Sequence, residues 1–170
     1  MGALKELWAA LPTGLSVSLP RVVVEELERR ASRAGVSVEE YLMDLLVRDL
    51  SPSEAAERYL RASMELVERA REELAKGDLR QASERVWGAC ALAIKAHAAR
   101  RGRLVASHAE LWAYKDEVAR ELGGWARAAF LKADSMRKNF YEGLATREDV
   151  EDSLRDVERL VSEVARALRA

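Results

Sequence analysis

The stretch "KGDLRQASERVWGACALAIKAHAARRG", residues 76–102, predicts a long helix that packs closely against its neighbours. Gly77 is an expected stop for the helix before it, and Asp78 is an expected N-cap. Small side chains, which let neighbouring helices approach one another, recur along the stretch at Ala82, Gly88, Ala89, Ala91 and Ala93. The stretch therefore belongs to the interior of a helical domain.

Helix start signals also locate the other helices of residues 51–170. "SPSE", residues 51–54, combines an N-cap serine, a proline in the first turn and a glutamate at the third position. We place a domain boundary there. "SHAE", residues 107–110, is a second capping box, and Thr146 with Asp149 caps a last helix. Four or five long helices with short connections predict an antiparallel bundle.

The N-terminal part of the chain has a different pattern. "GLSVSLP", residues 14–20, alternates apolar and polar side chains and predicts a short strand. Two helices are expected after it, within residues 21–35 and 36–50, and residues 1–14 are expected to form an arm. A lone strand needs a partner for its backbone groups, and the rest of the chain offers none. We therefore expect it to pair with its own copy in a homodimer.

Composition limits the possible functions. The 170 residues are 49% hydrophobic, which suffices for one or two small domains. The 28 basic and 29 acidic side chains nearly cancel, so any nucleic-acid site must be local. No apolar run approaches the roughly 18 residues of a membrane span. The single cysteine, Cys90, is expected to be a buried free thiol, and we expect a cytoplasmic protein from a thermophile.

Residues 15–50 resemble the ribbon-helix-helix family through "LSVSLP", "LERRASRAGVS" and "EEYLMDLL". The resemblance implies a homodimer in which two strands pair and enter the major groove of DNA. Ser16 and Ser18 stand at the positions that match the family's base readers. Because neither can make the bidentate contacts of Arg or Asn, we expect weak DNA binding or a segment that only dimerises.

The resemblance also implies a phosphate contact at the start of the second helix, near Ser37. Ser37 and Glu40 form an expected capping box there. Glu39 and Glu40 complement the helix dipole, but they are expected to repel a DNA phosphate.

Residues 51–170 resemble the PaREP-type archaeal family, whose bundle is similar to HEPN domains (higher eukaryotes and prokaryotes nucleotide-binding). The resemblance rests on "KGDLRQASERVWGACALAIKAHAARRG", "SHAELWAYKDEVARELG" and "SMRKNFYEGLATREDVEDSLRDVERLV". It implies a HEPN-like helical bundle for nearly the whole segment. Members of the PaREP-type family have no settled function, so the resemblance implies none for this chain.

Many HEPN domains are ribonucleases that use an arginine, a following polar residue and a histidine. The matching place here is "RKNFYEG", with Arg137 and Asn139, but Glu142 stands near the position of the histidine. No histidine follows His108, so no group that titrates near neutrality is available on that helix. The alternative is a ribonuclease or nucleotide-binding protein built on Arg137, Asn139, Tyr141 and Glu142. His97 or His108 would then be supplied by another helix. Asp134, Arg137 and Tyr141 share a helix face, on which a structural Arg–Asp pair is expected.

One basic cluster has two interpretations. Its members, near the end of one helix, are Lys95, Arg100, Arg101 and Arg103. Cations there complement the helix dipole, and they could also bind a phosphate or an RNA backbone. His97 is expected to be a partly buried histidine with satisfied hydrogen bonds. Two histidines and one cysteine at these spacings make no metal motif, so we expect neither a metal nor a cofactor.

Together these patterns predict a mostly α protein: a HEPN-like bundle preceded by a short strand and two helices of ribbon-helix-helix type. The preferred hypothesis is a non-catalytic homodimer that dimerises through residues 15–50. It would act as a binding or regulatory module, by weak DNA binding or antitoxin-like regulation. RNA or a partner protein is an alternative ligand, and the enzyme built on Arg137 is the alternative activity.

Overall fold

The computed structural model describes residues 16–170, and every regular element in that range is a helix. The helices are α2 (Arg21–Ala34), α3 (Val38–Leu46), α4 (Pro52–Lys76), α5 (Leu79–Ala99), α6 (His108–Leu122), α7 (Gly124–Glu142) and α8 (Arg147–Arg169). The prediction of a mostly α chain with a helical bundle is confirmed. Among these helices, none combines the length and the apolarity needed to cross a membrane.

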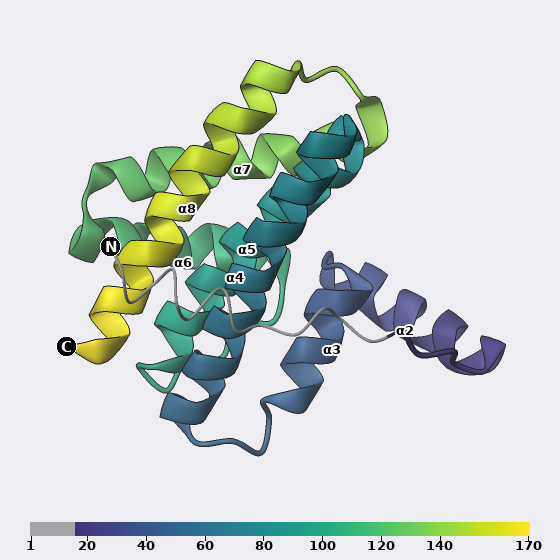
Figure 1. Cartoon of the computed structure of the whole chain (residues 1–170). Coiled ribbons are helices and arrows are strands. Elements are labelled where there is room, and N and C mark those ends of the chain that lie inside the picture. Colours follow the sequence, from purple (N-terminus) through teal and green to yellow (C-terminus); the bar gives the residue numbers. More distant parts are fainter. Residues whose placement is uncertain (1–15) are drawn as a thin grey trace.

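The bundle consists of α4 to α8, with α5 at its centre (Figure 1). α5 contacts α4, α6, α7 and α8, and every residue of its second half, 89–99, is buried. Only Gly77 and Asp78 separate α4 from α5, and Gly77 takes the left-handed conformation with φ of 83°. This tight turn sends α5 back along α4.

Close packing of α4 on α5 depends on the small side chains that the sequence places in α5. Ala82, Ala89 and Ala93 are completely buried. A Cβ atom at Gly88 would lie 2.8 Å from Leu66 Cδ1 on α4. The expected role of the small residues is confirmed.

The helix starts follow the local signals. Ser51, Ser107 and Thr146 each form a complete capping box with the residue three positions later. Ser37 caps α3 by accepting a hydrogen bond from the Glu40 backbone N–H at 3.0 Å. The other hydrogen bond of the expected capping box, from the Ser37 backbone N–H to the Glu40 side chain, does not form in α3. The Glu40 side chain turns into the interior instead.

The predicted strand does not form among the described residues. Residues 16–20 have no regular structure and are exposed, while Gly14, Leu15 and the arm of residues 1–14 lie outside the described range. A strand requires a neighbouring strand for its backbone hydrogen bonds. Residues 16–170 of this one chain contain no such neighbour, so alternation alone was insufficient for the prediction.

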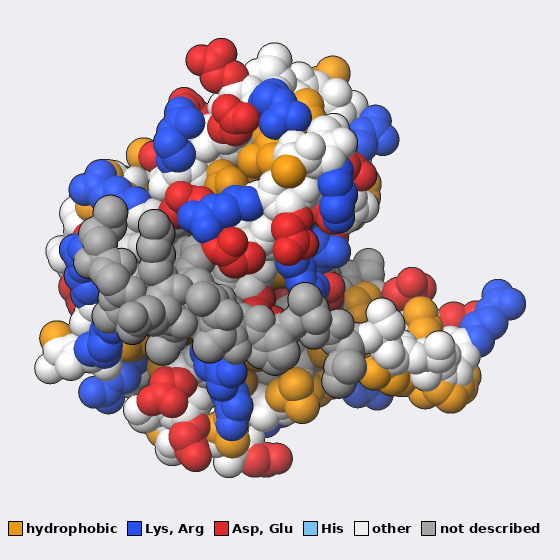
Figure 2. Space-filling view, viewed as in Figure 1, with side chains coloured by type: hydrophobic (Ala, Val, Ile, Leu, Met, Phe, Trp, Pro, Cys, Tyr) orange, Lys and Arg blue, Asp and Glu red, His pale blue; other side chains and the backbone are white. Residues whose placement is uncertain are grey.

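The two N-terminal helices differ in how they meet the bundle. α3 lies beside it, with Val47 and Met43 packed on the core, whereas α2 projects away from it (Figure 1). Apolar side chains are visible along the projecting helix in Figure 2. Val22 on α2 is 71% exposed, and Val17 just before it is 75% exposed. The described chain therefore leaves an apolar surface on its N-terminal segment without a covering partner.

Candidate functional site between the N-terminal helices and the bundle

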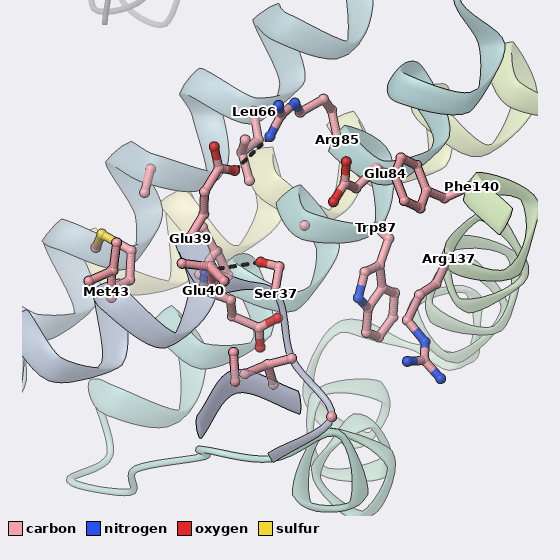
Figure 3. Close-up of a pocket in the computed structure, with 18 of the residues that line it drawn as sticks. Ser37, Glu39, Glu40, Met43, Leu66, Glu84, Arg85, Trp87, Arg137 and Phe140 are labelled. Carbon is pink, nitrogen blue, oxygen red and sulfur yellow. Dashed lines mark hydrogen bonds and ion pairs between the residues drawn. The ribbon is translucent and has the colours of Figure 1, made fainter. Parts of the chain in front are cut away.

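A cavity of about 820 Å³ lies between the N-terminal helices and the bundle. Figure 3 shows Glu39 and Glu40 of α3 on one side of it and Trp87 and Arg137 of the bundle on the other. The volume is within the range of about 300–1,000 Å³ that small-molecule sites occupy. The cavity is therefore large enough to act as a binding site.

Ion pairs fix the charges on the α3 side of this cavity. Glu39 accepts a hydrogen bond from Arg85 Nη1 at 2.6 Å, and Arg69 Nη1 lies 3.7 Å from the same carboxylate. Glu84 is a half-buried acid on the bundle side, and burial raises its pKa against the opposing effect of Arg85. The negative charge of Glu39 is thus largely balanced, which reduces the expected repulsion of a phosphate near the start of α3.

A buried cluster of charged groups lies next to the cavity and joins α3 to α4 and α5. Lys95 Nζ lies 2.8 Å from Glu40 Oε1 and 2.7 Å from Asp44 Oδ2. The Tyr59 hydroxyl donates to Asp44 Oδ1 at 2.7 Å. Because all of these side chains lie in the interior, water cannot screen their interactions.

A histidine and a carboxylate meet on the other side of Trp87. His108 Nε2 lies 2.8 Å from Asp134 Oδ1 and 3.2 Å from Trp112 Nε1. An indole N–H only donates, so Nε2 cannot both accept from Trp112 and donate to Asp134. The shorter contact favours the tautomer in which Nε2 donates to the carboxylate. In the neutral ring of this tautomer, Nδ1 is the nitrogen that can accept a proton.

His97 belongs to a separate, structural network. Its Nδ1 lies 3.0 Å from the Tyr114 hydroxyl and its Nε2 lies 3.1 Å from Glu121 Oε2. Burial lowers the pKa of His97, and the nearby Arg101 lowers it further. A neutral imidazole that accepts from Tyr114 and donates to Glu121 satisfies both ring nitrogens, which confirms the expected buried histidine.

A family model provides the comparison with known proteins. The model of the archaeal PaREP1/PaREP8 family matches residues 58–161 of the chain. The chain belongs to this family. No curated protein and no solved structure matches it.

The PaREP1/PaREP8 match covers only one part of the candidate site. It contains Lys95, His108 and Arg137, whereas α2 and α3, with Glu40 and Asp44, precede it. The cavity and the buried charge cluster therefore join the PaREP1/PaREP8 segment to an N-terminal segment outside the match.

The four residues of the possible enzyme site face different surroundings within the PaREP1/PaREP8 segment. Arg137 and Tyr141 line the cavity. Asn139 is buried, donates to Ser83 Oγ at 2.9 Å and accepts from the Ala145 backbone N–H at 2.6 Å. Glu142 lines a different depression beside α8. Arg137 is 3.9 Å from Asp134 Oδ1, so the structure brings it near His108 rather than near Glu142.

The predicted basic cluster is divided between the interior and the surface. Lys95 is buried, whereas Arg100, Arg101 and Arg103 lie at the end of α5 and beyond it. Arg101 bonds Glu121 and the His97 carbonyl oxygen, and Arg103 lies 5.0 Å from the centre of the Tyr114 ring. Only these arginines remain accessible for a phosphate.

The predicted DNA-contacting serines are also divided. Ser16 and Ser18 are exposed, whereas the Ser37 hydroxyl caps α3 and lines the cavity. Sequence reasoning missed Asp44 and Tyr59 as members of the charge cluster. A signal was present: Asp44 interrupts the apolar run "YLMDLL", just as Lys95 interrupts "ALAIKAHAA". An isolated charge in an apolar helical run favours a buried ion pair.

Proposed function

We propose that this PaREP1/PaREP8 protein is a non-catalytic homodimeric regulatory module that acts in the cytoplasm. Residues 15–50 would pair with a second copy of the chain in a ribbon-helix-helix-like arrangement, and residues 51–170 would form a HEPN-like bundle. The observation that carries the proposal is the exposed apolar surface of Val22 to Val24 on α2, which projects from the bundle, and of Val17 and Leu19 just before it.

A second copy would cover this surface in a way that the same chain does not. Each copy supplies an identical apolar face, and a two-fold axis would place the two faces against each other. Pairing of residues 16–20 across the axis would give their exposed backbone the partner that a strand requires. Burial of apolar surface at about 25 cal/mol per Å² would then stabilise the dimer.

DNA binding by such a dimer would be weak and sensitive to salt. Ser16 and Ser18 would supply the outward side chains of the ribbon, and neither can make a bidentate contact to a base. The backbone N–H groups at the start of α3 would contribute phosphate binding. The pairing of Glu39 with Arg85 supports this contact, because it balances the nearest acidic charge. Binding of this kind favours autoregulation or an antitoxin-like role.

The test measures assembly and DNA binding on full-length variants. Val22→Asp introduces a charge into the apolar surface, and Ser32→Asp introduces the same charge at an exposed position of α2 away from it. Sedimentation velocity would report the oligomeric state. Fluorescence anisotropy would report binding to a duplex from the gene's own upstream region at two salt concentrations.

We expect wild type and Ser32→Asp to be dimers and Val22→Asp to be a monomer with an unchanged helical content. Only the dimers should bind the duplex, and the affinity should fall steeply as salt rises. A monomeric wild type would refute the homodimer. A dimer that does not bind the duplex would limit residues 15–50 to dimerisation and direct the search to RNA or a protein partner.

The contact of His108 with Asp134 favours a second candidate, a HEPN-like ribonuclease. In this candidate Asp134 orients the imidazole and Nδ1 takes the proton of a 2′-hydroxyl. The 2′-oxygen then bonds to phosphorus, the bond from phosphorus to the 5′-oxygen breaks, and the departing 5′-oxygen takes a proton from water, while Arg137 stabilises charge on the phosphate. The test is cleavage of a labelled single-stranded RNA. A ribonuclease should lose turnover in His108→Ala and Arg137→Ala while His97→Gln retains it. Absence of cleavage by folded wild-type protein would refute this candidate.

A further inference from the structure

The buried cluster beside the cavity contains more acids than bases. Glu40 is 2% exposed, Asp44 is 8% exposed and Lys95 is 1% exposed. If all three were ionised, the interior would hold two negative charges against one positive charge. An uncompensated charge in the interior is strongly unfavourable, so one carboxyl group must be neutral or the cluster must open to water.

The hydrogen bonds indicate which carboxyl group is ionised. Asp44 accepts bonds from the Tyr59 hydroxyl and, through both of its oxygens, from the Lys95 ammonium group. Donors directed at a carboxylate favour its charged form. Glu40 has fewer such contacts: Oε1 lies 2.8 Å from Lys95 Nζ, and Oε2 has no partner among the described residues. Asp44 is therefore the partner of Lys95, and Glu40 is the excess acid.

The other groups near Glu40 act in both directions. Burial raises the pKa of Glu40 and is the largest influence; Asp44 raises it too, whereas Lys95 on α5 and His108 on α6 lower it. The position of Glu40 in the first turn of α3 also favours the charged form, but the dipole effect is modest. Burial, the adjacent Asp44 carboxylate and an Oε2 without a partner in residues 16–170 all favour the neutral acid.

We propose that Glu40 holds a proton at neutral pH and that this proton keeps α3 attached to the bundle. Loss of the proton would place two carboxylates beside one ammonium group in the interior. The charge would then be relieved by separation of α3 from α4 and α5, which would expose Glu40 to water. The attachment is therefore strongest at low pH and weakens as the pH rises through the value at which folded Glu40 ionises.

This attachment also controls the element next to it. The position of α2 depends on how α3 packs on the bundle, because only Gly35, Val36 and Ser37 separate the two helices. The proton on Glu40 thus provides a switch for the orientation of the exposed apolar surface of α2. The inference does not depend on the proposed dimer, since attachment of α3 can be measured in a monomer or in an oligomer.

The protonation state can be observed directly in the intact chain. Protein labelled with ¹³C at the glutamate side-chain carboxyl carbon gives signals whose positions differ between the acid and the carboxylate. We expect one signal at the acid position at pH 7, and its absence from the spectrum of Glu40→Gln. A Glu40 signal at the carboxylate position at pH 7 would overturn the proposal.

The effect on α3 is measured by amide hydrogen exchange between pH 5 and pH 9, corrected for the intrinsic exchange rate. In wild type the opening constant of α3 should rise with pH, by up to tenfold per pH unit, until folded Glu40 ionises, and should become constant above that transition. Glu40→Gln imitates the neutral acid and should keep α3 protected throughout. Asp49→Asn is the matched control, because it neutralises an exposed acid just beyond α3, and it should behave like wild type.

These measurements distinguish the proposal from a structural role of Glu40 alone. A pH-dependent opening that persists unchanged in Glu40→Gln would overturn it, as would a wild-type α3 whose protection is constant while the Glu40 signal changes from acid to carboxylate. Opening of α3 at pH 7 in Glu40→Gln would show that the charge, not the proton, is needed, and would also overturn it. Neither result bears on dimerisation, which sedimentation tests separately.

Discussion

Lys95 has a long, charged side chain, yet the core encloses it. Its ammonium group is held by Asp44 and Glu40, and its methylene groups replace part of the apolar packing of α5. A buried ion pair contributes little net stability compared with apolar groups of the same shape, but removal of one partner leaves an unpaired charge. The position should therefore tolerate substitution poorly.

We expect Lys95→Met to destabilise the protein by about 3–5 kcal/mol, because Asp44 would lose its cation in the interior. Lys76→Met is the control, since Lys76 forms an exposed pair with Glu73 at the end of α4, and it should have little effect on stability. Urea unfolding of the variants measures both values. Addition of Asp44→Asn to Lys95→Met should restore part of the loss, and a failure to do so would contradict the buried pair.

Gly88 tests the close approach of α4 to α5 at a single position. A Cβ atom there would meet the tip of Leu66, a flexible group that can turn away, so Gly88→Ala should be tolerated. Gly88→Val adds two methyl groups that must displace the neighbouring helix, and we expect a loss of about 1–3 kcal/mol. Gly124→Val is the matched control, because no atom lies near a Cβ there. Equal losses at the two sites in thermal unfolding would contradict a close helix contact at Gly88.

At the scale of the elements, Asn139 connects the end of α7 to α5 and to the start of the connection to α8. Its side chain bonds Ser83 on α5 and the backbone of Ala145. Asn139→Ala would leave the partly buried Ala145 N–H without its partner and remove a donor from Ser83, which still donates to the Leu79 carbonyl oxygen, at an expected cost of about 1–3 kcal/mol. Glu142→Ala, at the exposed end of the same helix, should have almost no effect.

Chemical unfolding and RNA cleavage together separate this structural role from a catalytic one. A structural Asn139 predicts lower stability with any cleavage rate unchanged once the variant is folded. A folded Asn139→Ala with wild-type stability would contradict it.

The sequence predicts these elements to different extents, for a physical reason. Ser51, Ser107 and Thr146 cap helices through contacts with residues three positions away, so short sequence patterns suffice to locate the starts of α4, α6 and α8. A strand depends on a distant partner, which is why the alternation of residues 14–20 was misleading for a single chain. The contacts of Lys95 with Asp44 and of His108 with Asp134 join different helices, and helical periodicity does not specify them.

At the scale of the whole molecule, two buried titrating groups act on one helix. Lys95 of the PaREP1/PaREP8 segment meets Glu40 and Asp44 of the N-terminal segment, whereas His97 pairs with Tyr114 and Glu121 within the PaREP1/PaREP8 segment. Lys95 and His97 both lie in the second half of α5, so titration of Glu40 and of His97 affects the packing of the same helix. The stability of the whole fold should consequently depend on pH in both directions.

On the acidic side this dependence is assigned to His97. Its pKa is lowered in the folded protein, chiefly by burial and then by Arg101, so the folded state favours the neutral ring. The neutral His97 ring contributes to the free energy of unfolding above its unfolded pKa of 6.5. This contribution is lost as the pH falls below that value. On the alkaline side Glu40 has the opposite sign, and its contribution is lost as the pH rises.

Between about pH 5 and 6.5 the two groups oppose each other, because unfolding takes up a proton at His97 and releases one at Glu40, each with a slope of at most about 1.4 kcal/mol per pH unit. Glu40→Gln removes the release, so its free energy of unfolding should decline from neutrality toward pH 5 and stay level on the alkaline side. His97→Gln removes the uptake, so its free energy of unfolding should fall as the pH rises from 5. Urea titrations at pH 5 to 9 measure both. Carboxylates with lowered pKa, such as Glu54 and Asp149, titrate at still lower pH and do not interfere. An acidic decline of Glu40→Gln that persists when His97→Gln is added to it would show that another group takes up the proton on unfolding.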